Sequence, residues 1–426
     1  MFSSLKGLFS PSNKDLRKRI YFTLAVLALF GLGTNIMVPG AKSITSKLGF
    51  IDLLNLMSGG GLRTFSIFSL GVMPYITASI LTQLLQMDVI PYFKELKEQG
   101  ATGRQVINKI NRYLGILFAF IQGYIYAVAF MQMTDTMQVV KTTIILTAGT
   151  ALLLWLADEV TKKGLGNGVS LFIMAGIVNS LPTTFKSAFT SLIQSSSIPQ
   201  TLGIILFIVF ILTYLIILIG VVFTEISQRR IPIQHSSRTD SSYNKEQAYL
   251  PLKLNSASVM PVIFASAITS IPSLIATFLK NDAFTQFCEK YIVYTNPTGF
   301  ALYIILIFAF GYVYTLMELN PKEMSENLDK SRAFIPGITP GDKTQAYLKG
   351  TLTRLSVSGS LFLAVLAAIP VIFSWISSAA NLSSQVTLGG TGLLIVVGVA
   401  LETFKQLESS VVSRSYASPR ERRRGR

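Results

Sequence analysis

The sequence has little of the chemistry that disulfides, metal sites and most catalytic centres need. It holds one cysteine, Cys288, and one histidine, His235, so neither an internal disulfide nor a Cys/His metal site can be built from it. Charged residues make up only 14% of the chain, whereas a water-soluble domain of this length carries about 25%. The shortage of charge argues against a water-facing globular enzyme and points to a chain that lies largely in lipid.

Long apolar runs stand where charged residues are missing. Half of the residues are hydrophobic and the mean hydropathy is +0.52. A helix needs roughly 20 apolar residues to cross a hydrocarbon layer of about 30 Å. The sequence therefore predicts an all-α polytopic membrane protein with ten spans, at about 20–38, 70–87, 113–132, 142–157, 168–185, 202–223, 259–279, 298–317, 355–375 and 389–404.

The centres of these spans carry no acidic or basic residue. Transporters driven by ions or protons normally keep such residues inside the bilayer. The sequence also lacks a phosphate-binding glycine loop, a carboxylate pair and a nucleophile beside a base. We therefore expect no enzyme, no cofactor and no metal, with the energy source in a partner. A passive channel, a small-solute transporter and a scaffold without a pore are the candidate classes, and the missing charge disfavours the transporter.

Lysine and arginine predict the orientation of the spans. With the N-terminus in the cytoplasm, the cytoplasmic segments hold 30 of the 37 Lys and Arg residues, as the positive-inside rule requires. Both termini are then cytoplasmic, and the net charge of +16 needs no nucleic acid to explain it. The basic residues before the first apolar run resemble a signal peptide, but no small-residue cleavage site follows, so we expect a retained span.

Ten spans divide into two sets of five, and because five is odd the second set runs inverted relative to the first. Inverted halves usually place a pathway at their interface. The expected organisation is an N-terminal half, then an outer loop with span six and a long cytoplasmic loop, then the last four spans with a second long loop at 318–354, and a basic tail. Their bounds are 1–185, 186–258, 259–404 and 405–426.

The most unusual stretch lies between residues 55 and 79. Gly59–Gly61 interrupt the chain, a short apolar segment with Arg63 follows, and Gly71 and Pro74 interrupt the start of the next span. One reading is an external loop that leads into a kinked helix. The other is a re-entrant half-helix, which is tolerated at membrane depth only where protein or water surrounds it.

Here the sequence resembles the SecY family of bacterial protein-conducting channels, and the similarity extends over almost the whole chain. Many short motifs occur in order and at the family's spacing. They include Ser58-Gly59-Gly60, Pro74-Tyr75-Ile76-Thr77-Ala78-Ser79-Ile80, Gly166-Asn167-Gly168-Val169-Ser170, Leu250-Pro251-Leu252-Lys253, Pro261-Val262-Ile263-Phe264-Ala265-Ser266, Asn320-Pro321, Pro336-Gly337-Ile338 and Gly389-Gly390-Thr391.

The resemblance implies an hourglass pore that aliphatic side chains close at its waist, and a plug helix beneath it at 58–69. A narrow ring of branched apolar groups sheds water and blocks ions without gripping any particular polypeptide. The expected ring is Val72, Ile76, Val169, Ile173, Ile263 and Ile395. The expected plug residues are Gly59, Gly60, Gly61, Leu62, Arg63, Phe65 and Ile67.

The resemblance also implies a lateral gate between spans two and three on one side and spans seven and eight on the other, near Gln83, Gln122, Ser266 and Thr269. Implied partners are SecE, SecG, the SecA motor, the ribosome, signal peptides, unfolded polypeptides and membrane lipids, at the bacterial plasma membrane. Expected contacts for SecA or the ribosome lie on the two long loops: Arg229, Arg230, Lys330, Arg332, Lys343 and Lys349. The stretches Arg230 to Gln234 and Tyr249 to Lys253 alternate as strands of a hairpin do.

The sequence departs from the family in its second long loop. Thr339 stands where the family usually has arginine, and Arg332 where it commonly has a small residue. We hypothesise that Arg332 compensates for the lost charge. These departures leave open whether the chain is a housekeeping channel or an accessory paralogue. The tail from 420 to 426 is a short arginine run.

Overall fold

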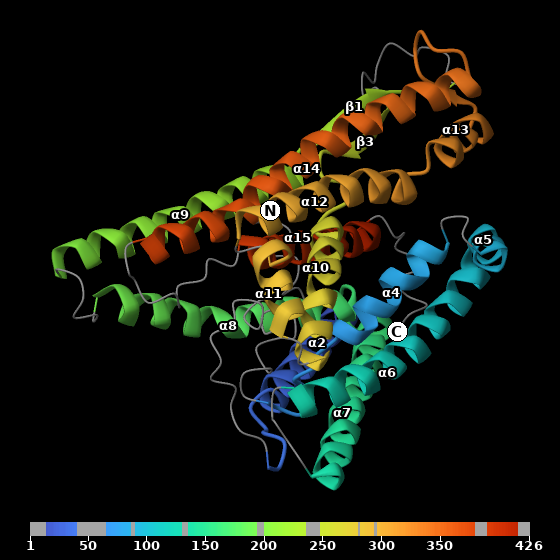
Figure 1. The fold of residues 1–426 in the computed structure, drawn as a ribbon. Coiled ribbons are helices and arrows are strands. Elements are labelled where there is room, and N and C mark those ends of the chain that lie inside the picture. Colours follow the sequence, from blue (N-terminus) through green and yellow to red (C-terminus); the bar gives the residue numbers. More distant parts are fainter. Residues whose placement is uncertain are drawn as a thin grey trace. The chain divides into compact units, whose positions relative to one another are not determined.

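The computed structural model describes residues 14–40, 65–86, 90–129, 135–193, 200–235, 248–279, 282–293, 296–379 and 390–415. The chain forms two compact units, the first made of Met1–Lys186 with Ile395–Arg426 and the second of Ser187–Leu394. Helices dominate both (Figure 1). The boundary after residue 186 lies one residue from the end predicted for the N-terminal half, while the segment from Ile395 onward groups with the first unit.

The helices of the first unit pair along their lengths. α6 (Ala101–Ala129) packs against both α4 (Met73–Leu85) and α7 (Thr136–Lys163), and α7 also contacts α2 (Lys14–Gly33). The short helix α5 (Pro91–Glu98) lies against α6. α8 spans Gly168–Ile193. α15, the last helix of the chain, spans Gly390–Ser415.

The second unit contains the long helices α9 (Gln200–Ile226), α10 (Met260–Leu279), α12 (Pro297–Glu318) and α14 (Asp342–Ala379). α12 packs between α10 and α14, and the short helices α11 (Asp282–Tyr291) and α13 (Pro321–Lys330) contact them. α13 is capped at its start by a side chain. Asn320 caps it by accepting the backbone N–H of Lys322 (3.1 Å), and Pro321 fills the first turn, where no N–H is needed.

Each of the ten predicted spans overlaps one of these helices. Among the described residues, five helices are long and apolar enough to cross a membrane: Thr136–Lys163, Gly168–Ile193, Thr201–Ile226, Pro297–Lys330 and Asp342–Ile369. Many large apolar side chains on them are exposed, such as Ile219 and Phe223 on α9. Such surfaces are costly in water and favourable in lipid, so the fold is that of a multi-pass membrane protein.

Two small sheets join the long loops of the second unit. β1 (Gln228–Pro232) pairs antiparallel with β3 (Tyr249–Lys253), so the predicted hairpin is confirmed, with its first strand starting two residues earlier than expected. β2 (Gln234–His235) pairs with β4 (Ala333–Phe334), which comes from the other loop. The two loops that the sequence treats separately therefore form one structure.

Candidate functional site

The predicted ring residues lie near the N-terminal ends of their helices, from the N-cap to the second turn. The backbone N–H of Ile76 donates to the carbonyl of Val72 (3.1 Å), so these two side chains share one face at the start of α4. Val169 and Ile173 have the same four-residue spacing at the start of α8, and Ile263 lies in the first turn of α10. Five of the six are buried, and Val169 is half-buried. Their convergence on one axis stays a prediction.

The described end of the predicted plug is tied to the end of α2. The backbone N–H of Val38 donates to the carbonyl of Phe65 (3.0 Å), and that of Ile67 donates to Ile36 (3.0 Å). Phe65 is fully buried with a positive φ of 46°. The described part of this segment forms turns and a bridge, and the next helix begins at Met73. Gly59, Gly60, Gly61, Leu62 and Arg63 lie outside the described residues.

One predicted gate residue lies beside a buried polar contact that the sequence reading missed. α4 and α6 approach closely where Gly115 meets Tyr75, and the Thr82 hydroxyl bonds the side chain of Asn111 across the two helices. Thr82 and Asn111 are both buried. Gln83 is next to Thr82, and its amide nitrogen lies 3.5 Å from the Ser79 hydroxyl. Nothing local in the sequence pairs Asn111 with Thr82, which lies 29 residues earlier.

On α10 the predicted gate hydroxyls are bonded within their own helix. Ser266 donates to the carbonyl of Ile263 (2.8 Å), and Thr269 donates to that of Ala265 (2.9 Å). α10 meets α12 through aromatic contacts, with the ring of Phe264 5.5 Å from that of Phe310. Gln122 is half-buried on α6. Because the two hydroxyls already have acceptors, separating α10 from another helix would leave neither unsatisfied.

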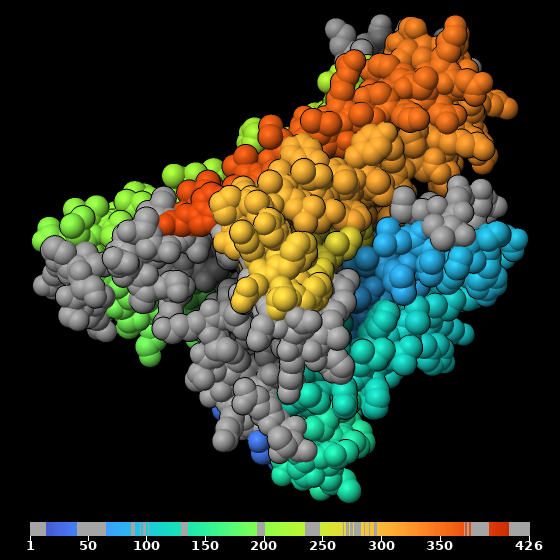
Figure 2. Space-filling model, viewed as in Figure 1, coloured from blue at the N-terminus to red at the C-terminus, as the bar shows by residue number. Residues whose placement is uncertain are grey.

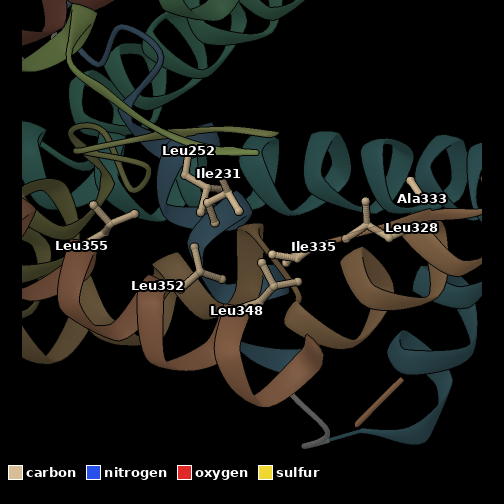
Figure 3. Close-up of a cluster of buried hydrophobic side chains, with 8 residues drawn as sticks. All are labelled: Ile231, Leu252, Leu328, Ala333, Ile335, Leu348, Leu352 and Leu355. Carbon is tan, nitrogen blue, oxygen red and sulfur yellow. The ribbon is translucent and has the colours of Figure 1, made fainter. Parts of the chain in front are cut away.

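The two long loops share a hydrophobic core (Figure 3), which we call the loop core. The hairpin contributes Ile231 and Leu252. The other members of the loop core come from α13, from β4 and the residue after it, and from α14. Leu348 and Leu352, one turn apart on α14, are fully buried. The loop core consists of Ile231, Leu252, Leu328, Ala333, Ile335, Leu348, Leu352 and Leu355. A core of this kind holds both loops in one defined shape.

All six predicted contact residues on these loops are exposed, namely Arg229, Arg230, Lys330, Arg332, Lys343 and Lys349. The guanidinium of Arg230 lies over the ring of Tyr249, 4.7 Å from its centre. Arg332 has a positive φ of 52°. That conformation costs an L-residue free energy and favours glycine. The loop core thus carries an exposed basic surface.

The hairpin is joined to the start of α10 through a buried carboxylate. Glu225, near the end of α9, is 6% exposed, and Asn255 donates to it (3.5 Å) and to the carbonyl of Ser258 (3.2 Å). The backbone N–H of Leu254 donates to the carbonyl of Ser227 (3.0 Å). Asn255 lies between β3 and α10, so these bonds link the loops to a membrane helix. Neither residue stood out in the sequence.

A helical multi-pass membrane protein with a basic, well-packed loop structure is the class that fold and site define. The sequence model of the SecY family matches residues 66–404. The chain belongs to the SecY family. It is 40% identical to the protein translocase subunit SecY of Bacillus subtilis (strain 168), over 98% of this chain and 99% of that protein.

Other comparisons agree with this family. The protein translocase subunit SecY of Staphylococcus aureus (strain NCTC 8325 / PS 47) is 38% identical, over 98% of this chain and 99% of that protein. A solved protein-conducting channel shares the fold with a TM-score of 0.65 at 20% identity, covering 95% of both chains. Sec61 in the canine ribosome–channel complex has a TM-score of 0.61 at 19% identity, over 95% of both chains.

Proposed function

We propose that this chain is the pore-forming subunit of a protein translocation channel. The observation that carries the proposal is identity of 40% along nearly the full length of a translocase subunit. The span centres without charge fit a passive passage for polypeptides. Unfolded secretory chains cross through the pore, and apolar segments of membrane proteins leave sideways into lipid.

The channel has ten spans with both termini in the cytoplasm of a bacterial cell, in the plasma membrane. Val72, Ile76, Val169, Ile173, Ile263 and Ile395 close its waist, and residues 58–69 act as the plug. The gate opens between α4 and α6 of one half and α10 and α12 of the other, near Gln83, Gln122, Ser266 and Thr269. Opening the gate costs little free energy at Ser266 and Thr269, because their hydroxyls keep the hydrogen bonds that they donate within α10.

The exposed basic surface on the loop core docks the partner that supplies energy, either the SecA motor or the ribosome. Its charge suits acidic protein surfaces and ribosomal RNA phosphates. Two solved relatives are channels bound to ribosomes, the canine Sec61 complex and the idle yeast Ssh1 complex. SecE and SecG complete the working unit.

Ion conductance in planar bilayers tests the proposal. Ile76→Asn, Ile263→Asn and deletion of residues 60–66 should each increase the leak, since a polar waist stays wet and a missing plug leaves it open. Ile305→Asn is the matched control, because Ile305 is 63% exposed on α12 and should leave the leak unchanged. A scaffold would pass no current in any variant, and a solute transporter would show saturable flux that depends on its solute.

A further inference from the structure

The short helix α11 presents an aromatic and basic face to its surroundings. Phe287 and Tyr291 lie four residues apart on the same face, are 52% and 44% exposed, and have ring centres 5.2 Å apart. Lys290 is exposed as well, with its ammonium 5.4 Å from the centre of the Tyr291 ring. Exposed aromatics beside a lysine are typical of segments at the boundary between water and lipid.

The opposite face of α11 is docked onto its neighbouring helices. Cys288 is 1% exposed, and its sulfur lies 3.7 Å from the carbonyl oxygen of Pro272 on α10. At the other end, the Thr298 hydroxyl of α12 donates to the carbonyl of Lys290 (2.8 Å). A Cβ at Gly299 would overlap the carbonyl of Val293, so the turn after α11 sits directly on the start of α12. α11 is thus held against both α10 and α12.

The contact with Pro272 shows where α11 lies along the length of α10. Pro272 lies seven residues before the end of α10 at Leu279, which is about 10 Å along a helix that rises about 1.5 Å per residue. α11 therefore folds back beside the last two turns of α10 instead of standing beyond them. An interfacial helix buries its apolar face roughly 5–10 Å into the boundary between headgroups and acyl chains. A helix held beside the last turns of a membrane span, as α11 is, suits such a position.

We propose that α11 lies in the outer membrane interface, with Phe287 and Tyr291 in the headgroup region and Lys290 directed at lipid phosphates. This inference rests on the proposed function, which makes α10 and α12 membrane spans. The occupant of the exposed face is the phospholipid surface. Both adjoining helices expose large apolar side chains, Ile268 on α10 and Ile305 on α12, so α11 is held by helices whose own surfaces belong in lipid. α11 then anchors one pair of gate helices at the membrane surface.

The first half of the chain carries a similar element in the corresponding position. α5 lies between the helices of spans two and three, as α11 lies between those of spans seven and eight. It buries Leu96 next to Gly103 of α6 and exposes Tyr92, and Ile90, just before the helix, is exposed as well. Since the halves run inverted, α5 would lie at the cytoplasmic interface. The presence of a short helix with an exposed aromatic residue at the corresponding position of each half supports a shared role for α5 and α11.

Site-directed spin labelling of the full chain in vesicles of phosphatidylethanolamine and phosphatidylglycerol tests the proposal. The label replaces Phe287 (Phe287→Cys) in a Cys288→Ala background, and its collisions with oxygen and with a water-soluble nickel chelate are compared. Ile305→Cys is the lipid reference and Lys343→Cys the water reference. The ratio of oxygen collisions to nickel collisions at 287 should lie between the ratios at 305 and at 343, and should be several-fold above that at 343.

The outcomes separate this inference from the proposed function. If the label at 287 has the same collision ratio as the label at 343, α11 lies in water. If the label at 287 collides with neither oxygen nor the nickel chelate, other parts of the protein cover it. Either result overturns the inference. If the label at 305 had the collision ratio of a water-exposed site, α12 would not be a membrane span and the proposed function would be contradicted instead. Should the cysteine background misfold, Phe287→Trp serves instead, with the emission of Trp155 and Trp375 subtracted using the parent chain. Lipids brominated near the headgroup should then quench the emission of the tryptophan at 287 more than lipids brominated deep in the acyl chain do. The reverse order contradicts the proposal.

Discussion

Gln234 lies opposite Phe334 in the antiparallel pairing of β2 with β4. This pairing joins two loops that are far apart in the sequence and places the hairpin, α13 and the start of α14 around one loop core. The exposed basic residues of both loops are therefore held by the same rigid support. A partner that binds one loop meets the other in a defined arrangement.

The loop core should be sensitive to the loss of Leu348. Leu348→Ala removes a fully buried side chain and should cost about 2–5 kcal/mol. Since every 1.4 kcal/mol is about a tenfold change in an equilibrium, trypsin should cut after Arg229 and Arg230 at least about tenfold faster. Leu361→Ala is the control, because Leu361 is 58% exposed on the same helix. Equal cleavage rates in the two variants would rule out a shared core.

Arg332 should show a conflict between stability and partner binding. Arg332→Gly relieves the positive φ of 52° and should stabilise the loop by about 1 kcal/mol, seen as a small rise in melting temperature. It also removes a charge, so binding of the ribosome or motor should weaken and depend less on salt. Arg332→Lys keeps the charge and should bind normally. Motor-driven transport unchanged by Arg332→Gly would refute the idea that Arg332 replaces the charge missing at Thr339.

The close approach at Gly299 should not tolerate a methyl group. In Gly299→Ala the new Cβ meets the backbone carbonyl of Val293, which cannot move without displacing α11 from α12. We expect a loss of more than about 1 kcal/mol of stability, with faster hydrogen exchange in α11. Gly350→Ala is the matched control: Gly350 is also helical but has open space, so alanine should stabilise by up to about 1 kcal/mol. Similar effects of both changes would contradict the tight turn.

Cys288 should react slowly with thiol reagents in the folded protein. Burial raises the pKa of its thiol, so at neutral pH less of the reactive thiolate is present than for a free cysteine. Maleimide labelling should therefore be slow and should rise at higher pH than in the denatured chain. The raised pKa also means that α11 loses stability as pH rises past the ordinary thiol range. As the chain has one cysteine, mass spectrometry reads the rate directly; a rate equal to that of the denatured chain contradicts the burial.

The hairpin could be foreseen because its signal is local. Strand alternation marked Tyr249 to Lys253, which pairs with Gln228–Pro232 in the structure. The contacts that hold the site together carried no such signal. Thr82 with Asn111 and Glu225 with Asn255 join residues distant in the sequence, and polar residues of these types occur at many positions with no partner of this kind.

The sequence by itself determined the class of protein, its apolar segments and its family. Hydropathy is a sum over neighbouring residues, and a membrane span needs a continuous run, so both can be read along the chain. The tertiary structure alone decided that the two loops share a core, that Arg332 has a positive φ, and that α11 folds back to Pro272. These features depend on which surfaces meet once the helices have packed, and packing is decided by shape and distance in space, not by order along the chain.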